Sequence, residues 1–348
     1  MIRQAGLRQA KLRSLAKINL DLRVLNRRAD GFHELRTVFQ TISLADTIEI
    51  AFEPSRKTSL EIEDALHIPD NLVLRAARLA LDAMKITGRV HFRLSKVIPM
   101  GAGLGGGSSN AAAVLLALPA LAGKSIGFEK LVGLGAELGA DVPFFLTGGT
   151  AVAVDRGTEL YSLADVSEDP ILIVDCGLHV DTRAAYQELR RELTLPGLSR
   201  NINDFQLFVR TLSESRSARA ASAFSANDFE PVVFSQFPQL HALFKRLGSV
   251  AARSGDGSAA RDTAPRSIAP GATRMTGSGS ALFALFRSTV ERDLVGESLG
   301  RDRRFQGSQV IPAKLVSRRS YQRLWHRQLA GTAVSGTGIW PPSNWHAR

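Results

Sequence analysis

Apolar and polar residues alternate in two early segments of the chain. In LAKINLDLRVL, residues 15–25, every second position is apolar, which is typical of a β-strand with one solvated face. Lys17, Asn19 and Asp21 therefore lie on the same side of this strand. The run RVHFRLSKVI, residues 89–98, alternates in the same way and predicts another strand.

A helical spacing of apolar residues replaces the alternation in two other segments. NLVLRAARLALDAMK, residues 71–85, predicts a helix that Asp70 or Asn71 caps. SNAAAVLLALPALAG, residues 109–123, predicts a helix rich in small residues that ends at Gly123.

The remaining patterns predict further strands joined by turns. Residues 29–52 begin with a turn at Asp30-Gly31 and continue with a short helix and a β-rich run at 47–52. Two apolar runs, 149–154 and 170–176, predict strands on either side of a turn-rich segment.

The chain is expected to divide within that turn-rich segment, near residues 165–169. Residues 227–247 predict helical structure, 252–272 have the composition of a flexible surface insertion, and 274–286 place a small glycine loop before an apolar strand. The sequence shows no internal repeat. We expect an N-terminal arm, an N-terminal domain, a C-terminal domain and a C-terminal tail, over residues 1–13, 14–167, 168–327 and 328–348.

The composition is that of a globular protein, with 348 residues of which 44% are apolar. Cys176 is the single cysteine, so an internal disulfide is excluded, and the seven histidines lack the spacing of a zinc site. The N-terminal residues lack the apolar stretch of a signal peptide, and no segment has the length and apolarity of a membrane span. We therefore expect a cytoplasmic protein that is not inserted in a membrane.

The formal net charge is +11, and the excess lies in the last third of the chain. From Lys245 onward there are 17 basic and 6 acidic residues. A basic surface attracts any polyanion, so the charge does not distinguish a nucleic acid from a small phosphorylated ligand. A solvated basic face is the simpler interpretation, and we expect no nucleic-acid partner.

A run rich in glycine and serine, PMGAGLGGGSSNAA at 99–112, lies between the predicted strand at 89–98 and the next predicted helix. Glycine permits positive φ and a close approach of the backbone to a ligand. Backbone N–H groups gathered at a helix N-terminus bind phosphate oxygens well. A tight turn between a strand and a helix would need only one or two glycines, so the run predicts a phosphate-binding loop.

Three common phosphate motifs fit this run poorly. Gly101, Gly103 and Gly106 match the dinucleotide-binding pattern, but the acidic residue expected about 20 positions later would fall near Glu129, in helical sequence. The AGKS at 122–125 lacks the earlier glycine of a Walker A loop. The lysine strand and the HRD and DFG triplets of protein kinases are absent from the sequence.

PMGAGLGGGSS closely resembles the phosphate loop of the GHMP small-molecule kinase superfamily, P-x-x-x-G-L-G-S/G-S-S. AKINLDL and MTGSGSALF resemble its N-terminal strand and its third motif. Within the superfamily, AKINLDLRVLNRRADGFHEL, GLGGGSSNAA and GADVPFFLTGGTA are similar to the kinases of 4-(cytidine 5′-diphospho)-2-C-methyl-D-erythritol, and ADGFHEL is diagnostic of that family. The resemblance covers roughly residues 14–327. The insertion at 252–272 and the residues outside that range exceed the family's usual length.

The resemblance implies an α+β fold of two lobes, an N-terminal lobe like ribosomal protein S5 domain 2 and a C-terminal ferredoxin-like lobe, with ATP and substrate in the cleft between them. It implies transfer of the γ-phosphoryl group of ATP to the 2-hydroxyl of the cytidine-diphosphate-linked methylerythritol, in the non-mevalonate route to isoprenoid precursors. One alternative is another GHMP kinase, acting on homoserine, mevalonate or a sugar. A second is a basic protein that binds nucleic acid on a degenerate kinase scaffold. The sequence leaves the oligomeric state open.

Phosphoryl transfer needs positive charge or N–H groups around the moving phosphoryl group and a base for the attacking hydroxyl. By resemblance, Asp141 in LGADVPFF is that base. Without the resemblance, Asp141 ahead of Pro143 would equally be a helix N-cap. Lys17 is the implied electrostatic partner of Asp141, although an exposed strand lysine is more often a surface group.

The resemblance also implies residues that contact the substrate. Asn19 would bond the diphosphate or erythritol part, and His33 would recognise the cytosine. Phe32, where the family frequently has tyrosine, would supply an aromatic plane, and Tyr186 a second one. The remaining expected contacts are Thr182, Gly277, Ser278 and Gly279.

On the nucleotide side, the glycine-rich loop would wrap the ATP phosphates, with Asn71 and Lys96 around the adenosine. One hydroxyl at the start of the helix, from Ser108 or Ser109, would reach Mg²⁺ directly or through water. The loop residues in this expectation are Pro99, Met100, Gly101, Ala102, Gly103, Leu104, Gly105, Gly106, Gly107, Ser108 and Ser109.

Overall fold

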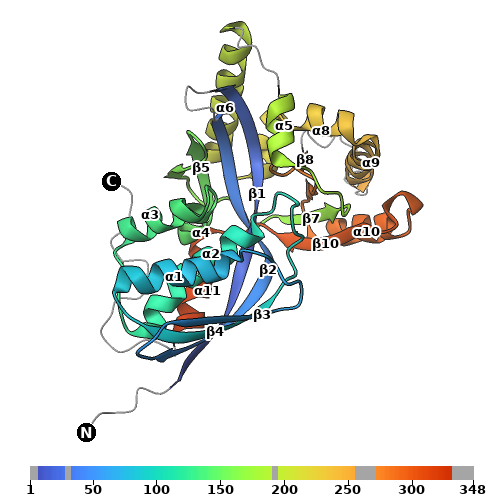
Figure 1. Cartoon of the computed structure of the whole chain (residues 1–348). Helices are drawn as coiled ribbons and strands as arrows, with labels where there is room; N and C mark the ends of the chain where they lie inside the picture. The colour runs from blue at the N-terminus through green and yellow to red at the C-terminus, as the bar shows by residue number, and fades with distance from the viewer. Residues whose placement is uncertain (1–6, 28–32, 190–194, 255–271, 331–348) are drawn as a thin grey trace.

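Two β-sheets with helices packed against them make up the computed structural model (Figure 1), which describes residues 7–27, 33–189, 195–254 and 272–330. Phe32, the predicted turn at Asp30-Gly31 and most of the predicted insertion at 252–272 lie outside the described residues.

The first sheet has six strands and is built around one long antiparallel pair. Its strands are β1 (Arg8–Arg27), β2 (His33–Pro54), β3 (Ser59–Asp64), β4 (Gly88–Ser95), β5 (Thr150–Val154) and β6 (Glu159–Ser162). The order is β3-β4-β2-β5-β6, with β1 also paired to β2. The β1–β2 register shifts three times, between Leu15 and Lys17, Asn19 and Asp21, and Val24 and Asn26, and such irregularities bend and twist a strand.

Two expectations for this sheet are corrected. The predicted strand at 15–25 begins earlier, at Arg8, so residues 8–13 of the predicted N-terminal arm belong to β1. The short helix predicted within 29–52 is wrong, because His33–Pro54 is one continuous strand. Its many β-branched residues favour extended backbone, and pairing with strands on both sides completes its hydrogen bonds.

Helices of the first lobe cover one face of this sheet (Figure 1). They are α1 (Leu72–Met84), α2 (Gly106–Ala122), α3 (Phe128–Leu138), α4 (Val142–Thr147) and α11 (Arg318–Leu329). Asn71 is the N-cap of α1 and Gly123 the C-cap of α2, as expected, while α2 begins three residues before its predicted start. Every residue of α2 from Ser109 to Leu121 is buried, which its small side chains allow because neighbouring helices and strands can approach closely.

The second sheet is antiparallel, with the order β10-β7-β9-β8. Its strands are β7 (Pro170–Asp175), β8 (Thr273–Met275), β9 (Leu282–Leu285) and β10 (Gln309–Lys314). With helices between β7 and β8 and between β9 and β10, this is the βαββαβ arrangement of a ferredoxin-like fold. The expected two-lobed α+β architecture is therefore confirmed.

Helices and 3-10 turns of the second lobe occupy the long connections of this sheet. They are α5 (Thr182–Glu188), α6 (Leu195–Ser215), α7 (Ala218–Ala221), η1 (Ser222–Phe224), α8 (Glu230–Gln236), α9 (Pro238–Ser254), α10 (Thr289–Gly300) and η2 (Arg303–Phe305). The helical structure predicted over 227–247 is two helices, since α8 ends before Pro238. The predicted glycine loop before an apolar strand is present, between β8 and β9.

The lobes share an apolar core along β1. Ala16, Ile18 and Leu20 cluster there with Ile173 of β7 and Phe283 of β9. This buries the apolar side of the strand, as the alternation predicts.

The opposite side of β1 was expected to be solvated, and this expectation is wrong. Lys17, Asn19 and Asp21 are only 4%, 2% and 0% exposed. Backbone segments from the second lobe cover this side, because Asn19 N–H donates to Thr276 Oγ1 and Leu22 N–H donates to the Ala226 carbonyl. The polar side of β1 therefore lies where the lobes meet.

The division near residues 165–169 stays a prediction. Strands β1–β6 precede it and β7–β10 follow it. The chain nevertheless crosses back, since Tyr321, Trp325 and Leu329 of α11 pack in the core of the first lobe. Residues 318–329, expected in the second domain and the tail, thus pack with the first lobe.

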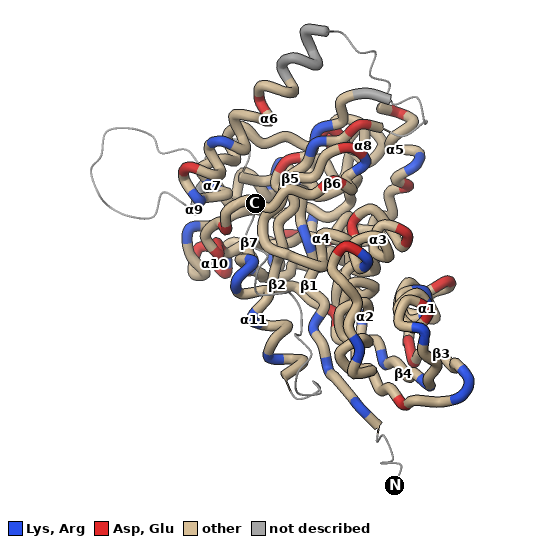
Figure 2. Tube along the Cα trace, turned by 90° about the vertical axis from the view of Figure 1, so that its left-hand side faces the viewer, with Lys and Arg blue, Asp and Glu red and all other residues tan. Residues whose placement is uncertain are grey.

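Five basic residues of the C-terminal third form ion pairs with acidic ones in the part of the chain that the structure describes. Figure 2 shows the two kinds close together around α10. No helix among the described residues has the length and apolar character needed to span a membrane. The ion pairs are Arg246–Asp302, Arg292–Asp293, Arg301–Glu297, Arg304–Asp302 and Lys314–Glu168.

Candidate active site

In the glycine-rich loop ahead of α2, glycines with positive φ alternate with residues whose side chains are buried. Gly101, Gly103 and Gly105 have φ of +68°, +78° and +69°, a region that glycine adopts without strain. Ala102 and Leu104 between them are 2% and 1% exposed. Glycines of positive φ that recur at every second position can turn backbone N–H groups to one side and make a concave anion site. The buried side chains hold that concave backbone in place.

Helix α2 begins at this loop without a side-chain cap, so the positive end of its dipole faces the loop. Ser109 Oγ donates to the Leu15 carbonyl at 2.7 Å, and Ser14 Oγ donates to Asn110 Oδ1 at 2.6 Å. These bonds fix α2 to β1 and use the Ser109 hydroxyl, so the expected contact of this hydroxyl with Mg²⁺ is not favoured. The half-buried Ser108 hydroxyl makes no hydrogen bond within the described residues and stays available.

The two glycine loops pack backbone against backbone. A Cβ on Gly103 would lie 2.2 Å from the Thr276 carbonyl oxygen, and one on Gly277 would lie 3.1 Å from Gly103 Cα. Ala281 N–H also donates to the Ala102 carbonyl. No side chain fits at Gly103, and the second loop therefore borders the phosphate loop.

Lys17 and Asp141 lie together beside the phosphate loop. Lys17 Nζ is 3.5 Å from Asp141 Oδ2, and the two side chains are 4% and 32% exposed. Lys17 N–H donates to the Leu104 carbonyl, which ties this part of β1 to the loop. Asp141 stands at the N-cap position of α4, but its carboxylate makes no capping bond. Asp141 therefore has the position of an N-cap residue, as the alternative interpretation expects, but its carboxylate faces Lys17 and does not cap the helix.

Asn19 and Phe39, in addition to Asp141, hold the Lys17 ammonium in place. Nζ donates to Asn19 Oδ1 at 2.8 Å and lies 5.0 Å from the centre of the Phe39 ring. Phe39 packs against Phe144 of α4 at 5.1 Å between centroids, so the short helix that carries Asp141 also supports the aromatic partner of Lys17. A cation over an aromatic face is attracted by the ring quadrupole.

Asn19 is fully engaged with protein groups. Its Oδ1 accepts from Lys17 Nζ and, at 3.0 Å, from Gly277 N–H, while its Nδ2 donates to Thr37 Oγ1 at 2.7 Å. At 2% exposure it does not face an open cleft, which differs from the expected contact with substrate. In the structure it joins Lys17 to the second glycine loop.

Besides Asn19, two other residues hold the second glycine loop, Asn227 and Thr182. Asn227 Nδ2 donates to the carbonyls of Met275 and Gly277 at 2.7 and 2.9 Å. Thr182 Oγ1 and Ser278 Oγ are 2.8 Å apart, so the structure brings together two residues expected to contact substrate. Asn227 was not found from the sequence, because nothing in SANDFEP marks a loop-binding amide.

His33, the first residue of β2, forms a stacked ring pair with Tyr186 of α5. Their centroids are 5.0 Å apart with an interplanar angle of 22°, and Tyr186 also meets Phe229 edge-on at 4.8 Å. Burial and, to a lesser extent, the charge of Asp141 raise the pKa of the Tyr186 hydroxyl. The Asp141 carboxylate therefore lies near enough to the Tyr186 hydroxyl for its charge to act on it.

Lys96 and Asn71 are placed by partners of their own. Lys96 Nζ forms an ion pair with the fully buried Asp46, whose other oxygen accepts from the N–H groups of Val97 and Ile98. A Cβ on Gly106 would lie 2.9 Å from Lys96 Nζ, so this ammonium borders the phosphate loop.

Asn71 uses its side chain to begin α1. Its Oδ1 accepts from Val73 N–H, and its Nδ2 donates to Asp64. This capping accounts for Asn71 structurally, and its expected contact with adenosine stays a prediction.

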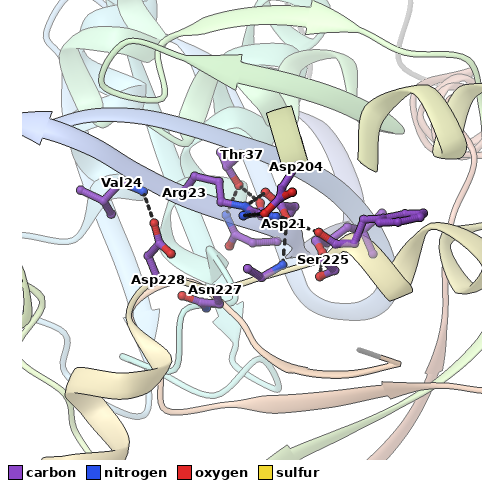
Figure 3. Close-up of polar contacts among 12 residues, drawn as sticks. Asp21, Arg23, Val24, Thr37, Asp204, Ser225, Asn227 and Asp228 are labelled. Carbon is purple, nitrogen blue, oxygen red and sulfur yellow. Dashed lines mark hydrogen bonds and ion pairs between the residues drawn. The ribbon is translucent and has the colours of Figure 1, made fainter. Parts of the chain in front are cut away.

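A second ion pair lies further along β1, at the lobe junction (Figure 3). Arg23 Nε and Nη2 donate to Asp21 at 3.0 and 3.1 Å, and Ala226 N–H donates to the same carboxylate at 2.8 Å. Arg23 Nη2 also donates to the Phe224 carbonyl, and its Nη1 is 3.9 Å from Asp204. Burial raises the pKa of Asp21 to about 6, with Arg23 acting against the rise.

The fold and site can be compared with those of known proteins. A model of the GHMP kinases N terminal domain matches residues 71–149. The 4-diphosphocytidyl-2-C-methyl-D-erythritol kinase of Solibacter usitatus (strain Ellin6076) is 49% identical over 334 residues, which cover 96% of each chain.

Solved structures agree with this relationship. A crystal structure of 4-(cytidine 5′-diphospho)-2C-methyl-D-erythritol kinase is similar with a TM-score of 0.67 and 32% identity, covering 88% of this chain and 98% of that one. Homoserine kinase from Cytophaga hutchinsonii has a TM-score of 0.64 at 18% identity, covering 91% and 98%, which shows a shared fold alone. The sequence identity and the fold together show that the chain belongs to the 4-diphosphocytidyl-2-C-methyl-D-erythritol kinase family of the GHMP kinases.

Proposed function

We propose that this chain transfers the γ-phosphoryl group of ATP to the 2-hydroxyl of 4-(cytidine 5′-diphospho)-2-C-methyl-D-erythritol, in the non-mevalonate route to isoprenoid precursors. The main structural support for this proposal is the Lys17–Asp141 pair, which lies where the two glycine loops meet. Family membership supports the choice of acceptor. A cytoplasmic location belongs to the same proposal, because ATP is consumed and the sequence holds a single cysteine.

Asp141 is the proposed base. As the substrate 2-hydroxyl oxygen bonds to the γ-phosphorus, the bond from that phosphorus to the bridging β–γ oxygen breaks, and ADP departs with that oxygen. The hydroxyl proton passes to the Asp141 carboxylate, whose 32% exposure gives it access to the cleft. Lys17 supplies a positive charge to the anionic oxygens in the transition state.

The loop at 101–105 and the uncapped start of α2 are the proposed binding site for the ATP phosphates. Their fit rests on the three glycines with positive φ and on the absence of a side-chain cap on α2. These groups bind through backbone N–H donors and therefore orient the phosphates with little side-chain entropy to lose.

Mg²⁺ belongs to the proposal as the ion carried with ATP. No cluster of three His, Cys, Asp or Glu side chains suited to a metal occurs in the described ranges, which fits an ion bound mainly through phosphate oxygens and water. Ser108 is the oxygen donor that would hold it from the protein side, directly or through water. When bound, it neutralises charge on the β- and γ-phosphates.

His33 and Tyr186 are the proposed contacts of the cytosine. Their ring contact supports this proposal, because it puts an imidazole and a phenol side by side and aromatic rings of this kind stack with a planar base. Thr182 and Ser278, whose hydroxyls meet at 2.8 Å, are proposed to contact the part of the substrate next to the phosphoryl acceptor.

An ADP-release assay tests the function directly. The purified chain is incubated with ATP, Mg²⁺ and either the cytidine compound, homoserine, mevalonate or galactose as acceptor. We expect release with the cytidine compound, loss of that release on adding EDTA, and background rates with the other acceptors. Faster release with another acceptor, or none with the cytidine compound, would contradict the proposal.

A further inference from the structure

Thr37 is a buried residue that sits behind the Lys17–Asn19 contact. It is 1% exposed and lies on β2, which pairs there with β1 on one side and β5 on the other. Its hydroxyl donates to the Asp21 carbonyl at 2.6 Å and accepts from Asn19 Nδ2 at 2.7 Å. Figure 3 shows Thr37 beside Asp21 at the lobe junction.

The hydroxyl of Thr37 decides which way the Asn19 amide points. A hydroxyl has one proton, and Thr37 gives it to the Asp21 carbonyl. Towards Asn19 the hydroxyl can then only accept, so it must meet the amide nitrogen and not the amide oxygen. The Asn19 oxygen is thereby turned to the opposite side.

That opposite side holds three donors, which are the Lys17 ammonium, the Gly277 N–H and, at 3.3 Å, the Thr276 hydroxyl. A reversed amide would face the ammonium and the Gly277 N–H with its own N–H groups and would leave its oxygen without a proton to accept from Thr37. Because an unsatisfied buried polar group is costly, the observed orientation is strongly preferred. Thr37 on one side and the donors on the other therefore favour the same orientation, and Thr37 is the acceptor on which the Asn19 Nδ2 group depends.

We propose that Thr37 is a positioning residue for Lys17, acting through Asn19, in the phosphoryl transfer proposed above. Thr37 orients Asn19, Asn19 Oδ1 holds Lys17 Nζ at 2.8 Å, and Lys17 faces Asp141 at 3.5 Å. The Thr37 hydroxyl itself bonds only to Asn19 and to the Asp21 carbonyl, and it contacts neither the glycine-rich loop nor the His33–Tyr186 rings. Removing the Thr37 hydroxyl thus releases the lysine while leaving both binding sites in place.

The test compares three variants in steady-state kinetics. Thr37→Val keeps the shape and removes the hydroxyl, and Thr37→Ser keeps the hydroxyl. Thr147→Val is the matched control, since Thr147 is also buried but its hydroxyl contacts only the Phe144 carbonyl of its own helix. All three are measured for kcat, for KM of ATP and of the cytidine compound, and for Tm.

We expect Thr37→Val to lower kcat about 10- to 100-fold, the loss typical of a misplaced catalytic group, with both KM values within about twofold of wild type. Thr37→Ser is expected to recover most of that loss, and Thr147→Val to retain wild-type kcat. A role in folding alone would lower Tm and leave the kcat of the folded enzyme unchanged. Unchanged kcat in Thr37→Val, or equal losses in the Val and Ser variants, would overturn the proposal.

Two further arms keep the result interpretable. If Thr37→Val does not fold, Thr37→Cys replaces it, because a thiol has a similar size but is a weak donor and acceptor. The kcat of Thr37→Cys is then expected to lie between the wild-type value and the value expected for Thr37→Val, which is about 10- to 100-fold lower. The wild-type assay separates the two proposals, since a failed function gives no turnover with the cytidine compound before any variant is made.

Discussion

Two ion pairs involve residues of strand β1 that lie a few positions apart, and they differ in how far the protein surrounds the carboxylate. Arg23 and Asp21 are 5% and 0% exposed, are joined by two parallel hydrogen bonds, and have further protein partners on both sides. Lys17 and Asp141 are 3.5 Å apart, and the carboxylate is one-third exposed. The first pair is saturated by the protein. In the second, only the lysine is held, and the carboxylate keeps free lone pairs.

This contrast distinguishes a pair that joins the two lobes from the pair that we propose to take part in phosphoryl transfer. A carboxylate that already accepts three strong hydrogen bonds has little capacity left to accept a substrate proton. A carboxylate that faces one ammonium at longer range can still do so. The variants below test that distinction, beginning with the largest expected effect.

Asp141→Asn is expected to lower kcat about 10²- to 10⁴-fold, the range for loss of a general base, while the KM for ATP and the Tm stay near wild type. Tm should not change because the Asp141 carboxylate caps no helix. Stopped assays of ADP release and thermal unfolding measure both. Asp293→Asn, a surface carboxylate on α10, is the control and should keep full activity. A variant that keeps its turnover would remove Asp141 from the role of base.

Arg23→Met should show the reverse pattern, with a stability loss of about 3–5 kcal/mol because it leaves Asp21 buried without its partner, and with kcat little changed below the Tm. Adding Asp21→Leu removes the orphaned charge and should restore most of the stability. Urea unfolding of wild type, the single variant and the double variant measures the two steps. A double variant no more stable than the single one would contradict our view of this junction.

Lowering the pH should stabilise wild type relative to Asp21→Asn. Burial raises the pKa of Asp21 from 3.8 to about 6, so the folded chain holds this proton more tightly than the unfolded chain. The contribution is fully present below pH 3.8 and is lost as the pH rises through about 6. Between these values the difference between the two proteins should change by up to about 1.4 kcal/mol per pH unit. Urea unfolding at several pH values checks the sign, and parallel curves would refute it.

Arg210→Ala should have the smallest effect. Arg210 and Glu214 form an i,i+4 pair on α6 and are 75% and 65% exposed, so water and salt screen their attraction. We expect no measurable change in Tm or kcat, as scanning calorimetry and the ADP-release assay would show. A clear loss of Tm or kcat would contradict the view that a more exposed ion pair contributes less to stability and activity.

The sequence indicated much of the site because the informative signals are local. The glycine run at 99–112 predicts its own backbone geometry, and Lys17 and Asp141 each stand in a recognisable motif. Strand alternation likewise placed Lys17 and Asn19 on one side of β1. These features depend on residues within a few positions of one another.

What the sequence did not indicate depends on residues far apart in the chain. The polar side of β1 looked solvated because its cover comes from Ala226 and Thr276, more than 200 positions later. Thr37 and Asn227 are single polar residues whose roles exist only once the two lobes meet. Helix α11 did leave a local signal, since Tyr321, Trp325 and Leu329 recur every four residues, but the surrounding basic residues obscured it.

The return of α11 to the first lobe has a consequence for synthesis on the ribosome. The Tyr321 hydroxyl donates to the Phe145 carbonyl at 2.6 Å, across 176 positions of sequence, and Trp325 fills the core beside it. The helix that presents Asp141 therefore lacks its supporting floor until nearly all of the polypeptide has emerged. A nascent chain halted after the first lobe would expose that apolar gap to chaperones, and the kinase becomes competent only when its last described helix docks.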